Sequence, residues 1–225
     1  MMVDQIQRRS LAGNIAIAFF AISFILITIA FATPNWLDSD YRTIGAKLDH
    51  LGLWTHCFRS PVDPYDFRDP RYVVNCRWIY EPFTTRYDQI RYFLVPSFMV
   101  ATQSFFTLCF ISVLVSAIVT LSHFWCCSPN MKQSFLLTQM NAYILLGGGL
   151  CGGIAVIVFA SLAIKSGWMP GPPGFLGWSF ALACVGVIAC LVASVLFWTD
   201  WTVQRRSRGR LMWPQARFEL ERPRA

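Results

Sequence analysis

The sequence predicts a membrane protein, mainly α: a left-handed bundle of four transmembrane helices with a small extracellular antiparallel β-sheet formed largely by the first loop. Three observations predict this fold class. Of 225 residues, 55% are hydrophobic and only 14% are charged, which is typical of a protein solvated by lipid. Four stretches without charged residues are each long enough to cross a ~30 Å hydrocarbon core. The polar segment between the first two stretches alternates like a β-strand and contains an isolated pair of cysteines.

We expect nine segments along the chain. They are a cytosolic N-terminus (1–12), a first span (13–32), extracellular loop 1 with the sheet (33–92), a second span (93–122), a cytosolic loop (123–136), a third span (137–164), extracellular loop 2 (165–175), a fourth span (176–198) and a basic cytosolic tail (199–225).

The first span has an alternative interpretation as a cleaved signal peptide. Arg8 and Arg9 precede it, and Ala30 and Ala32 form a small-x-small pattern that a signal peptidase accepts. The apolar stretch is longer than the ~7 to 15 residues of a signal peptide, so we expect a retained span.

Basic residues beside the spans predict the orientation. Arginines precede the first span and follow the last one, at Arg8, Arg9, Arg205, Arg206, Arg208 and Arg210. The positive-inside rule therefore places both termini in the cytosol. Because the net charge of +7 gathers at the membrane, we expect no nucleic acid partner.

Cys57 and Cys76 are the only two of eight cysteines in a polar loop. They indicate a disulfide if the loop faces an oxidising compartment, and free thiols or half a metal site if it does not. Only His50 and His56 lie near them in the sequence, which argues against a metal site.

Two further cysteines, Cys126 and Cys127, stand at the end of the second span. On the cytosolic side of the membrane they are candidates for palmitoylation, and unmodified thiols are the alternative.

The first loop has the pattern of two paired strands. Residues 72–80 alternate with one packed side, as a half-buried strand does. A weaker matching face indicates a partner strand that contains Leu51, Leu53, Thr55 and Cys57.

Glycines recur four residues apart in the third span, at Gly148, Gly149, Gly152 and Gly153. Small residues at this spacing let helix backbones approach closely. We expect them to pack within the bundle, and a dimer interface is the alternative.

Motifs of enzyme chemistry are absent from the sequence. It contains no glycine-rich phosphate loop, no HExxH or CxxC metal-ligand pair and no GxSxG element. The four expected spans hold no Asp, Glu, Lys, Arg or His, such as a transporter or pump usually keeps. We therefore expect no enzyme, no catalytic residue, no metal and no cofactor.

A tryptophan, a Gly-Leu-Trp triplet and two cysteines follow one another in the first loop. They are Trp36, Gly52, Leu53, Trp54, Cys57 and Cys76. Between the first two of four spans, this combination resembles the first-loop signature of claudins and the wider claudin and peripheral myelin protein superfamily. Arg91 is similar to the arginine that such proteins carry just before the second span.

The resemblance implies a cell-cell junction protein of the plasma membrane that forms or organises a paracellular barrier, at a tight or septate junction. It implies that Cys57 and Cys76 form the disulfide of an extracellular sheet and that the tryptophans pack the sheet on the bundle. The implied partners are the lipid bilayer, like or related four-helix proteins in cis and trans, and other junction proteins.

The sequence departs from vertebrate claudins in two places. The 18 residues between the two cysteines make a longer hairpin, which is similar to divergent invertebrate members of septate junctions. The C-terminal residues lack the Tyr-Val ending that binds PDZ scaffolds, which argues against such a partner.

The main alternative is an auxiliary subunit of a membrane channel or receptor with the same four-helix fold. Relatives in that role often carry a glycosylated first loop, and no Asn-x-Ser/Thr occurs in this sequence. A thiol oxidoreductase of the vitamin K epoxide reductase type would need a reactive CxxC, which is missing. A tetraspanin would have its large loop second, and a connexin would have three cysteines in each outer loop.

Overall fold

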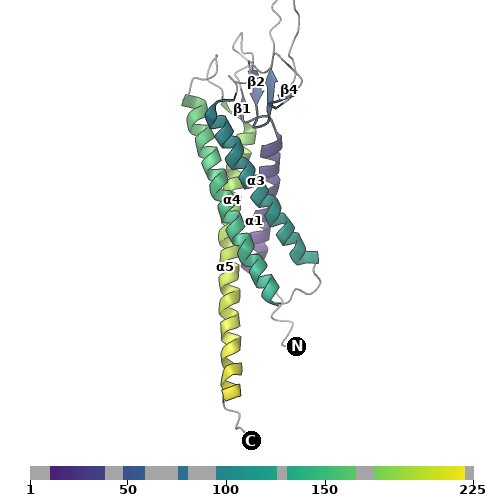
Figure 1. Ribbon diagram of the computed structural model, residues 1–225, viewed down its shortest axis with the longest axis vertical. Coiled ribbons are helices and arrows are strands. Elements are labelled where there is room, and N and C mark those ends of the chain that lie inside the picture. The colour runs from purple at the N-terminus through teal and green to yellow at the C-terminus, as the bar shows by residue number, and fades with distance from the viewer. Residues whose placement is uncertain are drawn as a thin grey trace, which may run out of the picture.

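A computed structural model shows a bundle of four long helices with a small β-sheet at one end (Figure 1). The structure describes residues 11–38, 48–58, 76–80, 95–125, 131–165 and 175–220. The helices are α1 (Leu11–Ala32), α3 (Ser97–Trp125), α4 (Met131–Lys165) and α5 (Trp178–Leu220). The strands are β1 (Leu37–Asp38), β2 (Leu48–Leu51), β3 (Thr55–Phe58), β4 (Cys76–Trp78) and β5 (Phe175–Leu176).

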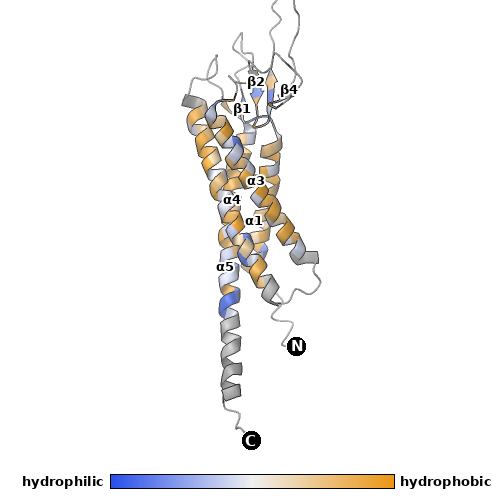
Figure 2. Ribbon diagram, in the orientation of Figure 1, coloured by the Kyte–Doolittle hydropathy of each residue, from blue (hydrophilic) through white to orange (hydrophobic). Residues whose placement is uncertain are grey.

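All four helices are long and apolar enough to cross a membrane. The candidate spans within them are Leu11–Ala32, Ser97–Ser122, Phe135–Ala163 and Trp178–Ser207. The ribbon of the bundle is coloured hydrophobic over most of its length (Figure 2). Large apolar side chains also lie on its outside, where Ile118, Ile157 and Ile188 are 67%, 68% and 61% exposed. Such a surface is costly in water and favourable in lipid. The predicted fold class, four apolar helices with a small antiparallel sheet, is confirmed.

The helices pack in the order α1, α5, α4, α3, with a smaller contact between α1 and α3. Each of the three main pairs has a buried side-chain hydrogen bond. Asn141 of α4 accepts from Ser116 Oγ at 2.9 Å and donates to Thr120 Oγ1 at 2.9 Å, both on α3. Ser23 of α1 donates to a carbonyl of α5 at 2.9 Å, and Ser194 of α5 donates to a carbonyl of α4 at 2.9 Å. These bonds satisfy polar groups that have no water partner in a bilayer.

The glycines of α4 face both neighbouring helices. A Cβ at Gly148 would lie 2.6 Å from Ser112 Cβ of α3, and one at Gly149 would lie 2.5 Å from Leu191 Cδ2 of α5. A Cβ at Gly152 would meet α5 and α3 together, and one at Gly153 would meet no heavy atom within 4 Å. Three of these four glycines therefore stand where another helix approaches closely.

The five strands lie in the order β4-β3-β2-β1-β5, and each neighbouring pair is antiparallel. The partner strand predicted through Leu51 and Cys57 is wrong as a single element, because β2 ends at Leu51 and β3 begins at Thr55. The N–H of Gly52 donates to the Thr55 carbonyl at 2.8 Å and closes the turn between them. Of the predicted strand at 72–80, residues 72–75 lie outside the described residues.

We predict that Gly152→Ala destabilises the bundle and that Gly153→Ala does not. A methyl group at Gly152 would lie 2.7 Å from Val187 Cγ2 and 2.8 Å from Cys109 Sγ, and overpacking of this kind costs about 1–3 kcal/mol. A methyl group at Gly153 would meet no heavy atom within 4 Å. Only the better helix propensity of alanine then affects the stability of that variant. Thermal unfolding of the two purified variants in detergent tests this difference, and equal midpoints would contradict it.

Candidate functional site

The sheet end of the bundle contains most of the signature residues, and Trp36 lies at its centre. Its backbone N–H donates to the carbonyl of Leu51 in β2 at 2.8 Å, and its carbonyl accepts from the N–H of Gly177 at 3.0 Å. Because Gly177 follows β5 directly, this one residue connects the strands of the first loop to the strand of the second.

The Trp36 side chain fills the space where three helices meet. The indole is fully buried, and its Nε1–H donates to the carbonyl of Ala30 in α1 at 2.7 Å. Its ring packs edge-on against Phe106 of α3, Phe159 of α4 and Phe180 of α5, with centroids 5.0, 5.2 and 5.8 Å away. Every helix of the bundle thus contacts the residue that directly precedes β1.

The Gly-Leu-Trp triplet forms the turn between β2 and β3, and each of its residues makes a different contact. A Cβ at Gly52 would lie 2.5 Å from the Cα of Pro34, so no side chain fits at this position. Leu53 is fully buried, and its carbonyl accepts from Nε2 of Gln103 in α3 at 2.6 Å. The Trp54 ring lies 5.5 Å from Phe31. The turn is therefore held against both α1 and α3.

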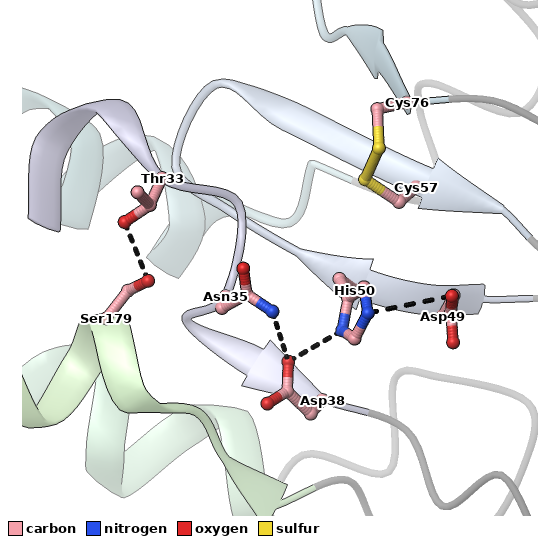
Figure 3. A network of polar contacts seen from close by, with 8 residues as sticks. All are labelled: Thr33, Asn35, Asp38, Asp49, His50, Cys57, Cys76 and Ser179. Carbon is pink, nitrogen blue, oxygen red and sulfur yellow. Dashed lines mark hydrogen bonds and ion pairs between the residues drawn. A yellow bond between two sulfur atoms is a disulfide. The ribbon is translucent and has the colours of Figure 1, made fainter. Parts of the chain in front are cut away.

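Cys57 and Cys76 form a disulfide, as the sequence predicts (Figure 3). They are directly opposite each other in β3 and β4. The bond closes a loop with a sequence separation of 19, and in the chain-entropy model such a crosslink stabilises the fold by about 3 kcal/mol.

A polar network lies on the sheet beside the disulfide (Figure 3). His50 of β2 is opposite Asp38 of β1, and its Nδ1 lies 2.9 Å from Asp38 Oδ1. Asn35 Nδ2 donates to the same oxygen at 3.3 Å, and His50 Nε2 lies 3.6 Å from Asp49 Oδ2. The side chains of His50 and Asp38 are 38% and 31% exposed, so solvent screens the pair and it contributes about 0–1 kcal/mol.

His56 of β3 contrasts with His50, because its side chain is fully buried. Desolvation by burial lowers the pKa of His56 from 6.5 to about 4. The imidazole is therefore neutral in the folded protein at physiological pH.

Some of the predicted site residues lie outside the described residues. Arg91, Cys126 and Cys127 are among them, so the structure does not address the expected arginine before the second span or the expected lipidation. Within the residues described, no group of three or more His, Cys, Asp or Glu side chains could hold a metal ion.

Two features of the structure escaped the sequence analysis. Gln103, which holds the Gly-Leu-Trp turn, is 3% exposed although it lies inside the apolar helix α3. Asp200, two residues beyond the expected end of the fourth span, is 4% exposed. Gln103 is a polar residue inside a long apolar stretch and Asp200 stands at the end of one, and these positions are the only signal the sequence offers for them.

These features define a class: a multi-pass helical membrane protein whose bundle carries a disulfide-linked sheet packed on a buried tryptophan. The family model described as PMP-22/EMP/MP20/Claudin tight junction matches residues 21–199. The chain therefore belongs to this family, and by this membership it is a claudin-like, junction-type membrane protein. A comparison with curated proteins found no match.

We predict that Trp36→Ala strongly destabilises the protein, whereas Trp78→Ala has little effect. Trp36 is fully buried and Trp78, in edge strand β4, is 52% exposed. Truncating a buried tryptophan costs about 3–5 kcal/mol, and the substitution also leaves the Ala30 carbonyl without the indole donor. Thermal unfolding in detergent measures both variants, and a Trp36→Ala midpoint within error of wild type would refute the packing role.

We predict that the sheet end loses stability in acid because of His56. Its pKa is lowered from 6.5 to about 4 in the folded state, so the unfolded chain binds more protons between these two values. The contribution of neutral His56 to the free energy of unfolding is fully present above pH 6.5. It falls by about 2 kcal/mol between pH 7.4 and pH 5. The slope should flatten in His56→Gln and persist in His50→Gln, as measured by unfolding across this pH range. An unchanged slope in His56→Gln would assign the acid loss to another group.

Proposed function

We propose that this protein forms or organises a paracellular barrier at cell-cell junctions, tight or septate, through its two extracellular loops. The observation that carries the proposal is that both loops contribute strands to one sheet, and that Trp36 fixes this sheet to every helix. A surface held rigidly before contact loses less conformational entropy when it binds. Family membership agrees with such a structural role and points away from an enzyme.

The orientation is part of the proposal. The Cys57–Cys76 disulfide supports a sheet outside the cell, because disulfides persist in oxidising compartments. The arginines beyond the last span support cytosolic termini by the positive-inside rule. The protein is then a multi-pass protein of the plasma membrane, gathered where two cells meet.

The two edges of the sheet support assembly with like or related four-helix proteins. Among the described strands, β4 and β5 lie at the edges of the sheet, and they expose Trp78 at 52% and Phe175 at 65%. Edge strands with large exposed apolar side chains are a common means of contact between chains. In this proposal they serve contacts in cis and trans with further junction proteins.

We predict that the tagged full-length protein concentrates at contacts between epithelial cells that lack their own junction strands, and that it raises the electrical resistance of the layer. Cys57→Ser should abolish both effects, because it breaks the crosslink between β3 and β4. Cys151→Ser is the matched control, since it removes a free cysteine within α4. Surface biotinylation shows whether each variant reaches the plasma membrane.

A uniform distribution of the wild-type protein over the cell surface, with unchanged resistance, would reject the barrier function. The auxiliary-subunit role would then become the better hypothesis, and proteins that co-purify with the chain would be the next to examine.

A further inference from the structure

Helix α5 continues well beyond the rest of the bundle at the end opposite the sheet (Figure 1). Trp178 and Trp198 stand near the two limits of its apolar part. They are 20 positions apart, which in a helix is a rise of ~30 Å, the thickness of a hydrocarbon core. Tyr143 and Trp201 lie beside Trp198, with ring centroids 5.3 and 5.0 Å away. Aromatic side chains favour the membrane interface, so α5 leaves the hydrocarbon close to Trp198.

Arginines follow directly after this aromatic group. We call the positions Arg205, Arg206, Arg208 and Arg210 the basic arc. All four are helical and fall within ~8 Å of rise, starting ~10 Å beyond Trp198, at the level of the phospholipid headgroups and the adjoining water. Figure 2 shows a short hydrophilic (blue) stretch of α5 beyond its apolar part.

The carboxylate nearest to the basic arc in the sequence, Asp200, lies against α1. Asp200 is 4% exposed and lies against the first turns of α1, where a Cβ at Gly13 would be 2.9 Å from Asp200 Oδ2. The positive end of the α1 helix dipole favours a carboxylate there. Gln204 Nε2 also donates to Asp200 Oδ2 at 2.9 Å.

Helical geometry places the arginines away from α1. At ~100° per residue, the four positions of the basic arc span roughly 200° of the helix circumference, and Asp200 lies opposite the middle of that span. Arg205 and Arg206 are exposed, and the Arg205 guanidinium lies 5.5 Å from the centre of the Trp201 ring. Arg205 and Arg206 therefore present positive charge outward, at the level where lipid headgroups surround the helix.

We propose that the basic arc binds anionic phospholipid headgroups of the leaflet on the side opposite the sheet. Guanidinium groups bind phosphate and carboxylate oxygens with paired hydrogen bonds. Each basic residue near a surface that contains phosphatidylserine favours binding by a factor of roughly five at low salt. With the orientation proposed above, this leaflet is the cytosolic one, which is rich in such lipids. The lipid contact itself does not depend on the barrier function.

The experiment measures which lipids surround the full-length protein. The chain is reconstituted into vesicles of phosphatidylcholine with a minor fraction of phosphatidylserine, and is then extracted in polymer discs with its adjacent lipids. Mass spectrometry gives the ratio of the two lipids. We expect the wild-type discs to be enriched several-fold in phosphatidylserine over the vesicles, and the enrichment to decline as KCl screens the charges.

Two triple variants separate the basic arc from the general charge of the tail. Arg206→Gln, Arg208→Gln and Arg210→Gln together should return the lipid ratio to that of the vesicles. Arg217→Gln, Arg222→Gln and Arg224→Gln remove the same charge further along the chain and should keep the enrichment. Arg205 stays in place because it contacts Trp201. Gel filtration and an intact Cys57–Cys76 disulfide show that each variant is folded.

Three results would overturn the proposal. The first is an absence of phosphatidylserine enrichment in the wild-type protein, as expected if the arginines bind an acidic protein instead. The second is an equal loss of enrichment in both triple variants. The third is an enrichment in the wild type that high salt does not reduce. The salt series uses the unmodified chain, so the proposal stays falsifiable even if the first triple variant does not fold. None of these results bears on cell contacts or resistance.

Discussion

The burial of Trp36 is the constraint on which the rest of the sheet end depends. Its ring occupies the meeting point of the helices, while its backbone amide and carbonyl bond to β2 and to the residue after β5. Burying an indole is favourable only if its N–H finds an acceptor, and the end of α1 provides one. A single residue thereby joins the helix packing to the strand pairing, so neither is expected to form fully without the other.

The sheet is too small to be stable by itself, since strands of two to four residues bury little area. Three effects of different size hold it. Burial against the bundle is the largest, the disulfide between β3 and β4 follows, and the solvent-exposed pair of His50 and Asp38 adds least. Close approach of the backbone is also needed: a side chain at Gly177 would collide with the carbonyl oxygen of Asn35, just as one at Gly52 would collide with Pro34.

The parts of the fold that the sequence predicts are those with a long or repeated signal. Charge-free stretches give the four helices, and two cysteines alone in a polar loop give the disulfide. The sequence does not reveal the turn at Gly52, because Leu51, Leu53 and Thr55 keep the spacing of two that is typical of a strand through the turn. A strand as short as β5 has no period to detect. The burial of Asp200 against Gly13 depends on the packing of α5 on α1, which local sequence does not encode.

Strand β5 is attached to the sheet by backbone pairing with Leu37 and Asp38, while its own Phe175 and Leu176 remain exposed. The pairing of β5 with β1 therefore depends little on which side chains β5 carries. Duplicated genes could accumulate different residues on this edge while every copy kept the same folding requirements. Diversity of contact preferences within such a family would then arise at a position where natural selection on stability is weak.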